Sequence, residues 1–179
     1  HFRVPIFENP LNNIEKLVLK EFYVTKDEFS SMIDSFPKLV SLSLKEYKIE
    51  CLCDDEEYGF DSLVHSFLKQ VSNLTHLKKL ELDRFQTDCF EFHLDGILPI
   101  ILIKGQLPSL RKLTINPFGF RFAAVCQAFS HFASTQPEKS FILQSSWKTT
   151  KQKEIKKEIS RKARNVTVKN YDFEVDPFI

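Results

Sequence analysis

Glycine is scarce in this chain of 179 residues, which contains only four glycines and no glycine-rich loop. Loops of that kind cradle phosphates in nucleotide-binding proteins, so the sequence gives no sign of that class. A nucleophile beside a base, or a pair of acids at catalytic spacing, is not found either. The histidines His65, His76, His93 and His131 are scattered without partner spacing. We therefore expect no enzyme, no cofactor and no small-molecule substrate.

Cysteine is also rare, with four in the whole chain. Cys51 and Cys53 lie too close together for a routine disulfide, and the other two fall in ordinary segments. This usage is typical of reduced thiols and favours a cytoplasmic or nuclear location. Two glycosylation sequons, at Asn73 and Asn165, argue the other way, although the second falls in an expected strand.

Neither an excess of one charge nor a long apolar run is present. The 25 basic and 24 acidic residues give a net charge of +1, so the overall electrostatics point to neither nucleic acid nor an anionic membrane. The longest apolar stretch, residues 97–103, is far shorter than the roughly 18 residues of a membrane span. The alternation of Phe2, Val4 and Ile6 resembles a strand without its predecessor, so we expect a fragment of a larger protein.

What the chain does contain is a repeated spacing of apolar residues, Leu-x-x-Leu-x-Leu. The four clear copies are Ile14, Leu17, Leu19; Leu39, Leu42, Leu44; Leu77, Leu80, Leu82; and Leu110, Leu113, Ile115. Two degenerate copies follow, one carrying Phe141 and Leu143 and the other Ala163, Val166 and Val168. The two closing residues of a copy alternate with polar ones, which predicts a short strand with one inward face.

Apolar residues at steps of three and four predict a helix after each strand. The residues that show this period are Phe29, Met32, Ile33, Phe36; Phe60, Leu63, Val64, Phe67, Leu68, Val71; Ile97, Leu98, Ile101, Leu102; Phe122, Val125, Cys126, Phe129, Phe132; and Ile155, Ile159. A single strand-and-helix unit cannot bury its apolar face alone. Stacked units would form a parallel sheet inside an arc, with helices outside.

This pattern resembles the leucine-rich-repeat family, in the intracellular strand-helix type found in F-box proteins and nucleotide-binding innate immune sensors. The segment Leu98–Ile115 carries the resemblance best, because an apolar helix, a glycine turn and the repeat strand occur in order. It implies an α/β fold, namely an irregular leucine-rich-repeat solenoid of short horseshoe shape, with parallel strands on the concave face and helices on the convex face. We expect one such domain over residues 1–179, uneven because the second unit carries an insertion.

The chain departs from the family in the turn after each strand. Where the family commonly has Asn or Cys, this sequence has aromatic residues: Phe22, Tyr47, Phe85, Phe118 and Tyr171. We interpret them as a structural spine along one edge of the core. The alternative is an exposed aromatic binding stripe.

Polar residues that flank the inward leucines would project from the concave face, where a partner can bind. The candidate partner-binding residues are Lys16, Lys20, Lys45, Lys79, Glu81, Asp83, Lys112 and Asn116. The lysines would form a mildly basic band suited to an acidic peptide or a phosphorylated partner. The alternative is a solvated strand face with lysines for solubility.

Two charged segments are further candidate sites. The insertion at 51–59 combines two thiols with four carboxylates, but the spacing fits neither zinc nor calcium, so we expect no metal and interpret it as an acidic loop. Residues 148–164 predict a basic helix that turns Ile155 and Ile159 inward. Its basic patch consists of Lys151, Lys153, Lys156, Lys157, Arg161 and Lys162. An exposed solubilising helix is the alternative to a binding patch.

Taken together, these patterns favour a non-catalytic module that recognises another protein. The resemblance implies the substrate-recognition repeats of an F-box ubiquitin-ligase receptor. One alternative is the ligand-sensing or autoinhibitory repeats of an innate immune sensor. Another is contact with nucleic acid or phospholipid through the basic helix, which would weaken steeply with salt. We expect a protein partner rather than nucleic acid, and no membrane span.

Overall fold

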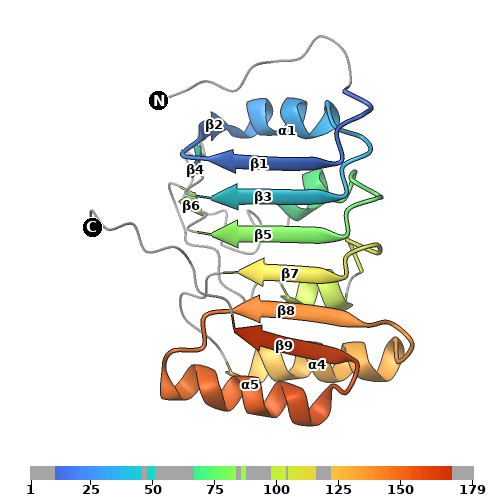
Figure 1. Cartoon of the computed structure of the whole chain (residues 1–179), viewed down its shortest axis with the longest axis vertical. Helices are drawn as coiled ribbons and strands as arrows, with labels where there is room; N and C mark the ends of the chain where they lie inside the picture. The colour runs from blue at the N-terminus through green and yellow to red at the C-terminus, as the bar shows by residue number, and fades with distance from the viewer. Residues whose placement is uncertain are drawn as a thin grey trace, which may run out of the picture.

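The computed structural model describes residues 11–45, 48–50, 67–83, 86–87, 98–103, 105–115 and 122–170. In these ranges the chain has an α/β fold around a six-stranded sheet whose strands are all parallel (Figure 1). The strands in sheet order are β1 (Lys16–Lys20), β3 (Ser41–Lys45), β5 (Lys79–Asp83), β7 (Lys112–Ile115), β8 (Phe141–Ser145) and β9 (Val166–Asn170). The α/β class and the parallel sheet predicted from the leucine spacing are confirmed.

A second, smaller sheet lies where the main strands end. Its three parallel strands, in order, are β2 (Tyr23–Thr25), β4 (Lys48–Glu50) and β6 (Gln86–Thr87). In the first unit only two residues separate β1 from β2, and Glu21 makes this tight turn with a positive φ of 56°. The backbone N–H of Glu21 donates to the carbonyl oxygen of Lys45, which ties the first turn to the second unit.

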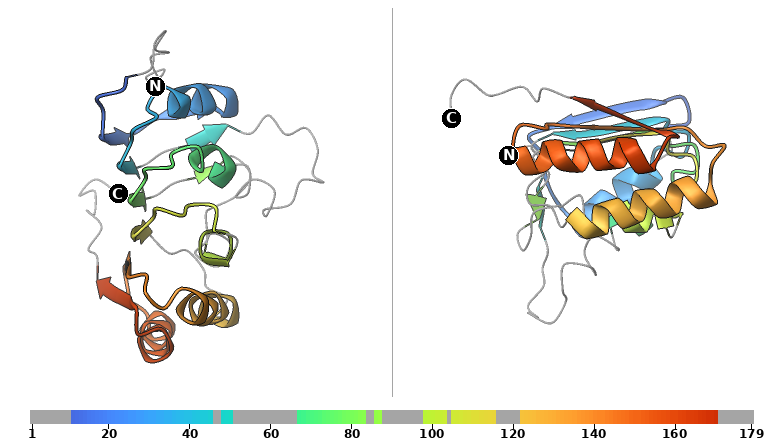
Figure 2. Two further views of the ribbon diagram at one scale, coloured as in Figure 1. Left: turned by 90° about the vertical axis from the view of Figure 1, so that its right-hand side faces the viewer. Right: turned by 90° about the horizontal axis from the view of Figure 1, so that it is seen from below.

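The helices are α1 (Lys26–Asp34), a helical stretch at 67–71, the π-helical turn η1 (Pro99–Ile103), α4 (Phe122–Thr135) and α5 (Thr150–Lys162). Figure 2 shows α1, α4 and the helical turns between them on one side of the main sheet. No helix within the described ranges covers the opposite side. The sheet therefore has a helix-covered inner face and an open outer face.

The apolar core lies between the inner face and the helices. One register line of inward residues runs through Leu17, Leu42, Leu80, Leu113, Leu143 and Val168. The four central members are buried, whereas Leu17 and Val168 on the edge strands are only partly buried. From the helices, Phe29, Ile33 and Phe129 are fully buried against this line. The helical periods predicted for α1 and α4 thus face the core.

The last two strands enter the sheet two residues out of step with the repeat pattern. The pattern would align Phe141 with Leu113, but Leu143 lies opposite Leu113 instead. Phe141 lies two residues before Leu143 on β8, and its ring centroid is 6.4 Å from that of Phe129 and 5.7 Å from that of Phe132. A phenylalanine ring needs this space beside α4, which accounts for the shift.

The third helix differs from the prediction in type. A regular helix was expected from Ile97 to Leu102, whereas η1 is a π-helical turn that buries Ile100, Ile101 and Leu102. Its first residue is Pro99, at a position where the missing N–H costs little. Gly105 follows with a φ of +64°, a conformation that favours glycine, so the expected glycine turn is present.

Helix α5 closes the lower end of the core, beside β9 (Figure 1). Thr149 caps its start, since its side chain accepts from the backbone N–H of Gln152 and the Gln152 side chain accepts in return from Thr149. Ile155 and Ile159 are buried, as the sequence predicted. The helix is slightly shorter than the predicted 148–164.

Several expectations lie wholly or partly outside the described residues. They concern the strand at 2–6, the insertion at 51–59 and, from the aromatic spine, Tyr47, Phe85, Phe118 and Tyr171. Phe22 is described, and it is partly buried against the core, as a structural spine requires. None of the helices in the described ranges has the length and apolar character to cross a membrane.

Candidate partner-binding face of the sheet

The outer face of the main sheet presents its side chains in two rows across the strands. Because side chains alternate along a strand, the residues between the inward leucines point outward. The first, here called the lysine row, consists of Lys16, Ser41, Lys79 and Lys112, which are register partners on β1, β3, β5 and β7. The second, here called the polar row, consists of Ser43, Glu81, Thr114 and Gln144 on β3, β5, β7 and β8.

Hydrogen bonds and an ion pair engage the side chains of the polar row. Ser43 Oγ donates to Glu81 Oε2 at 3.0 Å, and Lys45 Nζ lies 3.4 Å from Glu81 Oε1. Thr114 Oγ1 donates to Gln144 Oε1 at 3.1 Å. Because Lys45 and Ser43 hold both oxygens of the Glu81 carboxylate, its charge is largely balanced within the face.

The lysine row has no such compensation. In the described part of the chain, Lys16, Lys79 and Lys112 form no ion pair. Lys79 and Lys112 are direct register partners on adjacent strands, which lie about 4.8 Å apart in a sheet. Like charges placed opposite each other repel and lower stability. The row is therefore a local concentration of unbalanced positive charge.

An open hollow of about 450 Å³ lies over these rows. It extends from Glu15 and Val18 at β1 to Lys112 and Thr114 on β7. Val18 is 44% exposed, an unusual state for an aliphatic residue in a strand of this sheet. The hollow thus combines one exposed apolar side chain with a cluster of cations.

Most of the residues proposed from the sequence come together here. Lys16, Lys45, Lys79, Glu81 and Lys112 all line the hollow. Of the remaining three, Lys20 is exposed at the end of β1 away from the hollow, and Asp83 is only 3% exposed. Asn116 lies outside the described residues. Asp83 is thus withdrawn from the accessible surface on which the sequence placed it.

The sequence search for site residues left out Glu15 and Val40, which also line the hollow. Both precede a strand, and their carbonyl oxygens accept backbone bonds from the next strand, as in Ser41 N–H to Glu15. Each stands immediately before a lysine-row position, Lys16 or Ser41. The position immediately before a strand recurs in each unit, so Glu15 and Val40 could have been predicted from the sequence by this position.

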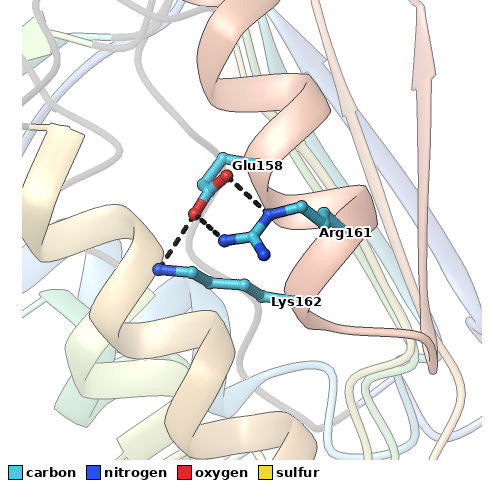
Figure 3. A network of polar contacts seen from close by, with 3 residues as sticks. All are labelled: Glu158, Arg161 and Lys162. Atoms are coloured by element: carbon cyan, nitrogen blue, oxygen red, sulfur yellow. Dashed lines mark hydrogen bonds and ion pairs between the residues drawn. The ribbon is translucent and has the colours of Figure 1, made fainter.

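The basic helix α5 carries less free charge than its composition suggests. Glu158 accepts from Arg161 at 3.0 and 2.8 Å, and Lys162 Nζ lies 2.9 Å from it (Figure 3). The hydrogen bond from Arg161, followed by that from Lys162, lowers the pKa of Glu158 to about 2. Lys156 Nζ donates to Asn170 Oδ1 at 2.7 Å. Only Lys151, Lys153 and Lys157 of the predicted basic patch are without a partner among the described residues.

Other reactive groups in the described part of the chain do not form a site. Burial raises the pKa of the Cys126 thiol, which disfavours the reactive thiolate. No group of three or more His, Cys, Asp or Glu side chains suited to a metal ion occurs among the described residues. The amide nitrogen of Asn165, in the second sequon, donates to the carbonyl oxygens of Gln136 and Lys139. A glycan at that nitrogen would disrupt these bonds.

Comparison with known proteins adds no relative: the scan against family models and the searches of curated proteins and solved structures each found no match.

Proposed function

We propose that this chain is an irregular leucine-rich-repeat solenoid that recognises another protein without catalysing a reaction. The partner would bind on the outer face of the six-stranded sheet, over the lysine row and the polar row. The regular succession of parallel strands and helices supports the repeat architecture, because each unit adds one strand beside the previous one.

The open outer face is the observation that carries this proposal. Parallel sheets are almost always covered on both faces. Here helices cover one face, and no described helix covers the other (Figure 2). The outer face carries the exposed side chains of Lys16, Lys79 and Val18 around a hollow, so it offers a surface to bind. In the proposed solenoid this outer face would be the concave one, and repeat proteins use their concave surfaces to bind partners.

Within this proposal, the resemblance suggests a more specific role in the cytoplasm or nucleus. We favour substrate capture for an F-box ubiquitin-ligase receptor over the ligand-sensing or autoinhibitory repeats of an innate immune sensor. A second candidate function is contact with nucleic acid or phospholipid through α5. It is favoured by the exposed side chains of Lys151, Lys153 and Lys157.

The test compares proteins captured from cell extract by the wild type and by two charge-reversed variants. In the first, Lys79→Glu with Lys112→Glu reverses the charge on the sheet face. In the second, Lys153→Glu with Lys157→Glu makes the same charge change on α5. Urea unfolding of all three proteins verifies that the variants are folded. Proteins captured by the wild type are identified and quantified by mass spectrometry.

We expect a specific protein to be lost from the sheet-face variant and retained by the α5 variant. Loss only from the α5 variant, with steep salt dependence, would replace the proposal by the second candidate. If all three proteins capture the same partners, the sheet face is not the binding surface.

A further inference from the structure

The lysine row has the charge and hydrogen-bond donors to bind a compact dianion. Lys79 and Lys112 are register partners without ion pairs in the described part of the chain, and Ser41 on the neighbouring strand adds a hydroxyl. An anion between the two ammonium groups would replace their repulsion with attraction. A phosphoryl group carries nearly two charges and three acceptor oxygens, whereas a carboxylate carries one charge and two oxygens. The row therefore fits a phosphoryl group better.

The rest of the hollow disfavours a continuous chain of phosphates. Glu15 lines it, and its carboxylate would repel a nucleic-acid backbone that crosses the face. Single-stranded nucleic acids also stack their bases on aromatic side chains. No lining residue is aromatic, and all of them are within the described ranges. An isolated phosphate on a peptide matches these features.

Val18 supplies a second contact at a definite distance from the cations. It lies on β1, whereas Lys79 and Lys112 lie on β5 and β7, so two to three strand spacings separate them. At about 4.8 Å per spacing, the midpoint between the two lysines is about 12 Å from β1, and because Val18 lies two residues along the strand from the lysine row, it is about 14 Å from Val18. An extended peptide covers that distance in about four residues at about 3.3 Å each.

We propose that the outer face binds an extended peptide that carries a phosphorylated residue and, about four positions away, an apolar residue. The phosphoryl group lies between Lys79 and Lys112, and the apolar side chain packs on Val18. This inference rests on the proposed function, because it names the chemistry of the partner for the same face.

The test measures the affinity of synthetic peptides by isothermal titration calorimetry. The probe is an alanine heptapeptide with leucine at its second position and phosphoserine at its sixth, together with the peptide of reversed order. The matched peptides replace phosphoserine with serine, or leucine with alanine. The protein variants are Lys79→Met with Lys112→Met, the charge-conserving pair Lys79→Arg with Lys112→Arg, and Val18→Ser.

For at least one peptide order, we expect the phosphorylated form to bind at least about tenfold tighter than the serine form. The methionine pair removes this preference, and the arginine pair keeps it. In the wild type the leucine peptide binds more tightly than its alanine version, and in Val18→Ser the two bind equally. As a matched control, Lys153→Met with Lys157→Met on α5 leaves all affinities unchanged.

Equal affinities of the phosphorylated and serine peptides would overturn the inference. So would a preference that survives the methionine pair or disappears in the α5 control. Tighter binding of a thymidine oligonucleotide than of the phosphopeptide, lost in the methionine pair, would instead identify a polyanion surface. Failure of this inference is distinguishable from failure of the proposed function. Suppose that, in phosphatase-treated extract, the wild type still captures a partner that the sheet-face variant does not capture. The outer face would then still be the protein-binding surface, and binding would not depend on phosphate.

Discussion

Helix α5 should contribute to stability through its two buried isoleucines rather than through its charges. Ile155 is 0% exposed, at the end of the core that α5 closes (Figure 1). Replacing Ile155 with alanine removes three carbon atoms, which at about 0.8 kcal/mol each is about 2.4 kcal/mol of lost burial. The cavity left behind raises the expected loss in free energy of unfolding to about 3 kcal/mol.

Urea unfolding followed by circular dichroism measures this loss, with Lys157→Ala as the matched control on the same helix. Lys157 is exposed, so its replacement should change the free energy of unfolding by no more than about 0.5 kcal/mol. In a protein of this size, the loss at Ile155 corresponds to a fall in Tm of about 6–12 °C. A loss below about 1 kcal/mol for Ile155→Ala, or equal losses in both variants, would refute the packing of α5 against the core.

Three further predictions concern single polar contacts. Thr25→Ala removes the cap of α1 and should lower the free energy of unfolding by about 1 kcal/mol, whereas Thr25→Ser should retain most of it in the same urea assay. Ser145→Ala leaves the buried carbonyl oxygen of Ile115 without its 2.7 Å bond and should cost about 1–2 kcal/mol; an unchanged urea midpoint would contradict this. The pKa of the Glu158 carboxyl, followed by carbon NMR, should be about 2, and closer to its ordinary value of 4.5 in Arg161→Ala. Because its folded pKa is lowered, its stabilising contribution is full above pH 4.5 and is lost as the pH falls toward 2.

The elements that were predictable depend on spacing along the chain. The alternation around Leu42 and Leu44 marks an inward strand face, and the spacing of Ile155 and Ile159 marks one face of a helix. These periods follow from the geometry of strands and helices, so short windows of sequence contain them. The outward position of Lys79 and Lys112 follows from the same alternation.

The features that escaped prediction depend on contacts between distant segments. The shifted register of β8 arises because Phe141 packs against α4, and the carboxylate of Glu81 accepts a hydrogen bond from Ser43, 38 residues earlier. The burial of Asp83 is likewise a property of the assembled sheet. Neither packing volume nor a cross-strand partner is encoded in a local period. The sequence therefore predicted that Glu81 and Asp83 lie on the partner-binding face, but it could not predict their contacts or their burial.

The adjacency of Lys79 and Lys112 should have opposite effects on stability and on binding, because it destabilises the sheet but provides the charge that binds a phosphate. If the outer face served only solubility, opposite charges on the two strands would serve it equally well and would not repel. Lys112→Glu places a carboxylate opposite Lys79 and should raise the free energy of unfolding slightly, by about 0.5 kcal/mol or less at this partly exposed position. The same change should abolish the preference for the phosphorylated peptide, because it puts a negative charge where the phosphate would bind. Urea unfolding and peptide titration of this one variant measure both effects, and a variant that is both less stable and equally selective would show that the two lysines stabilise the sheet rather than bind a partner.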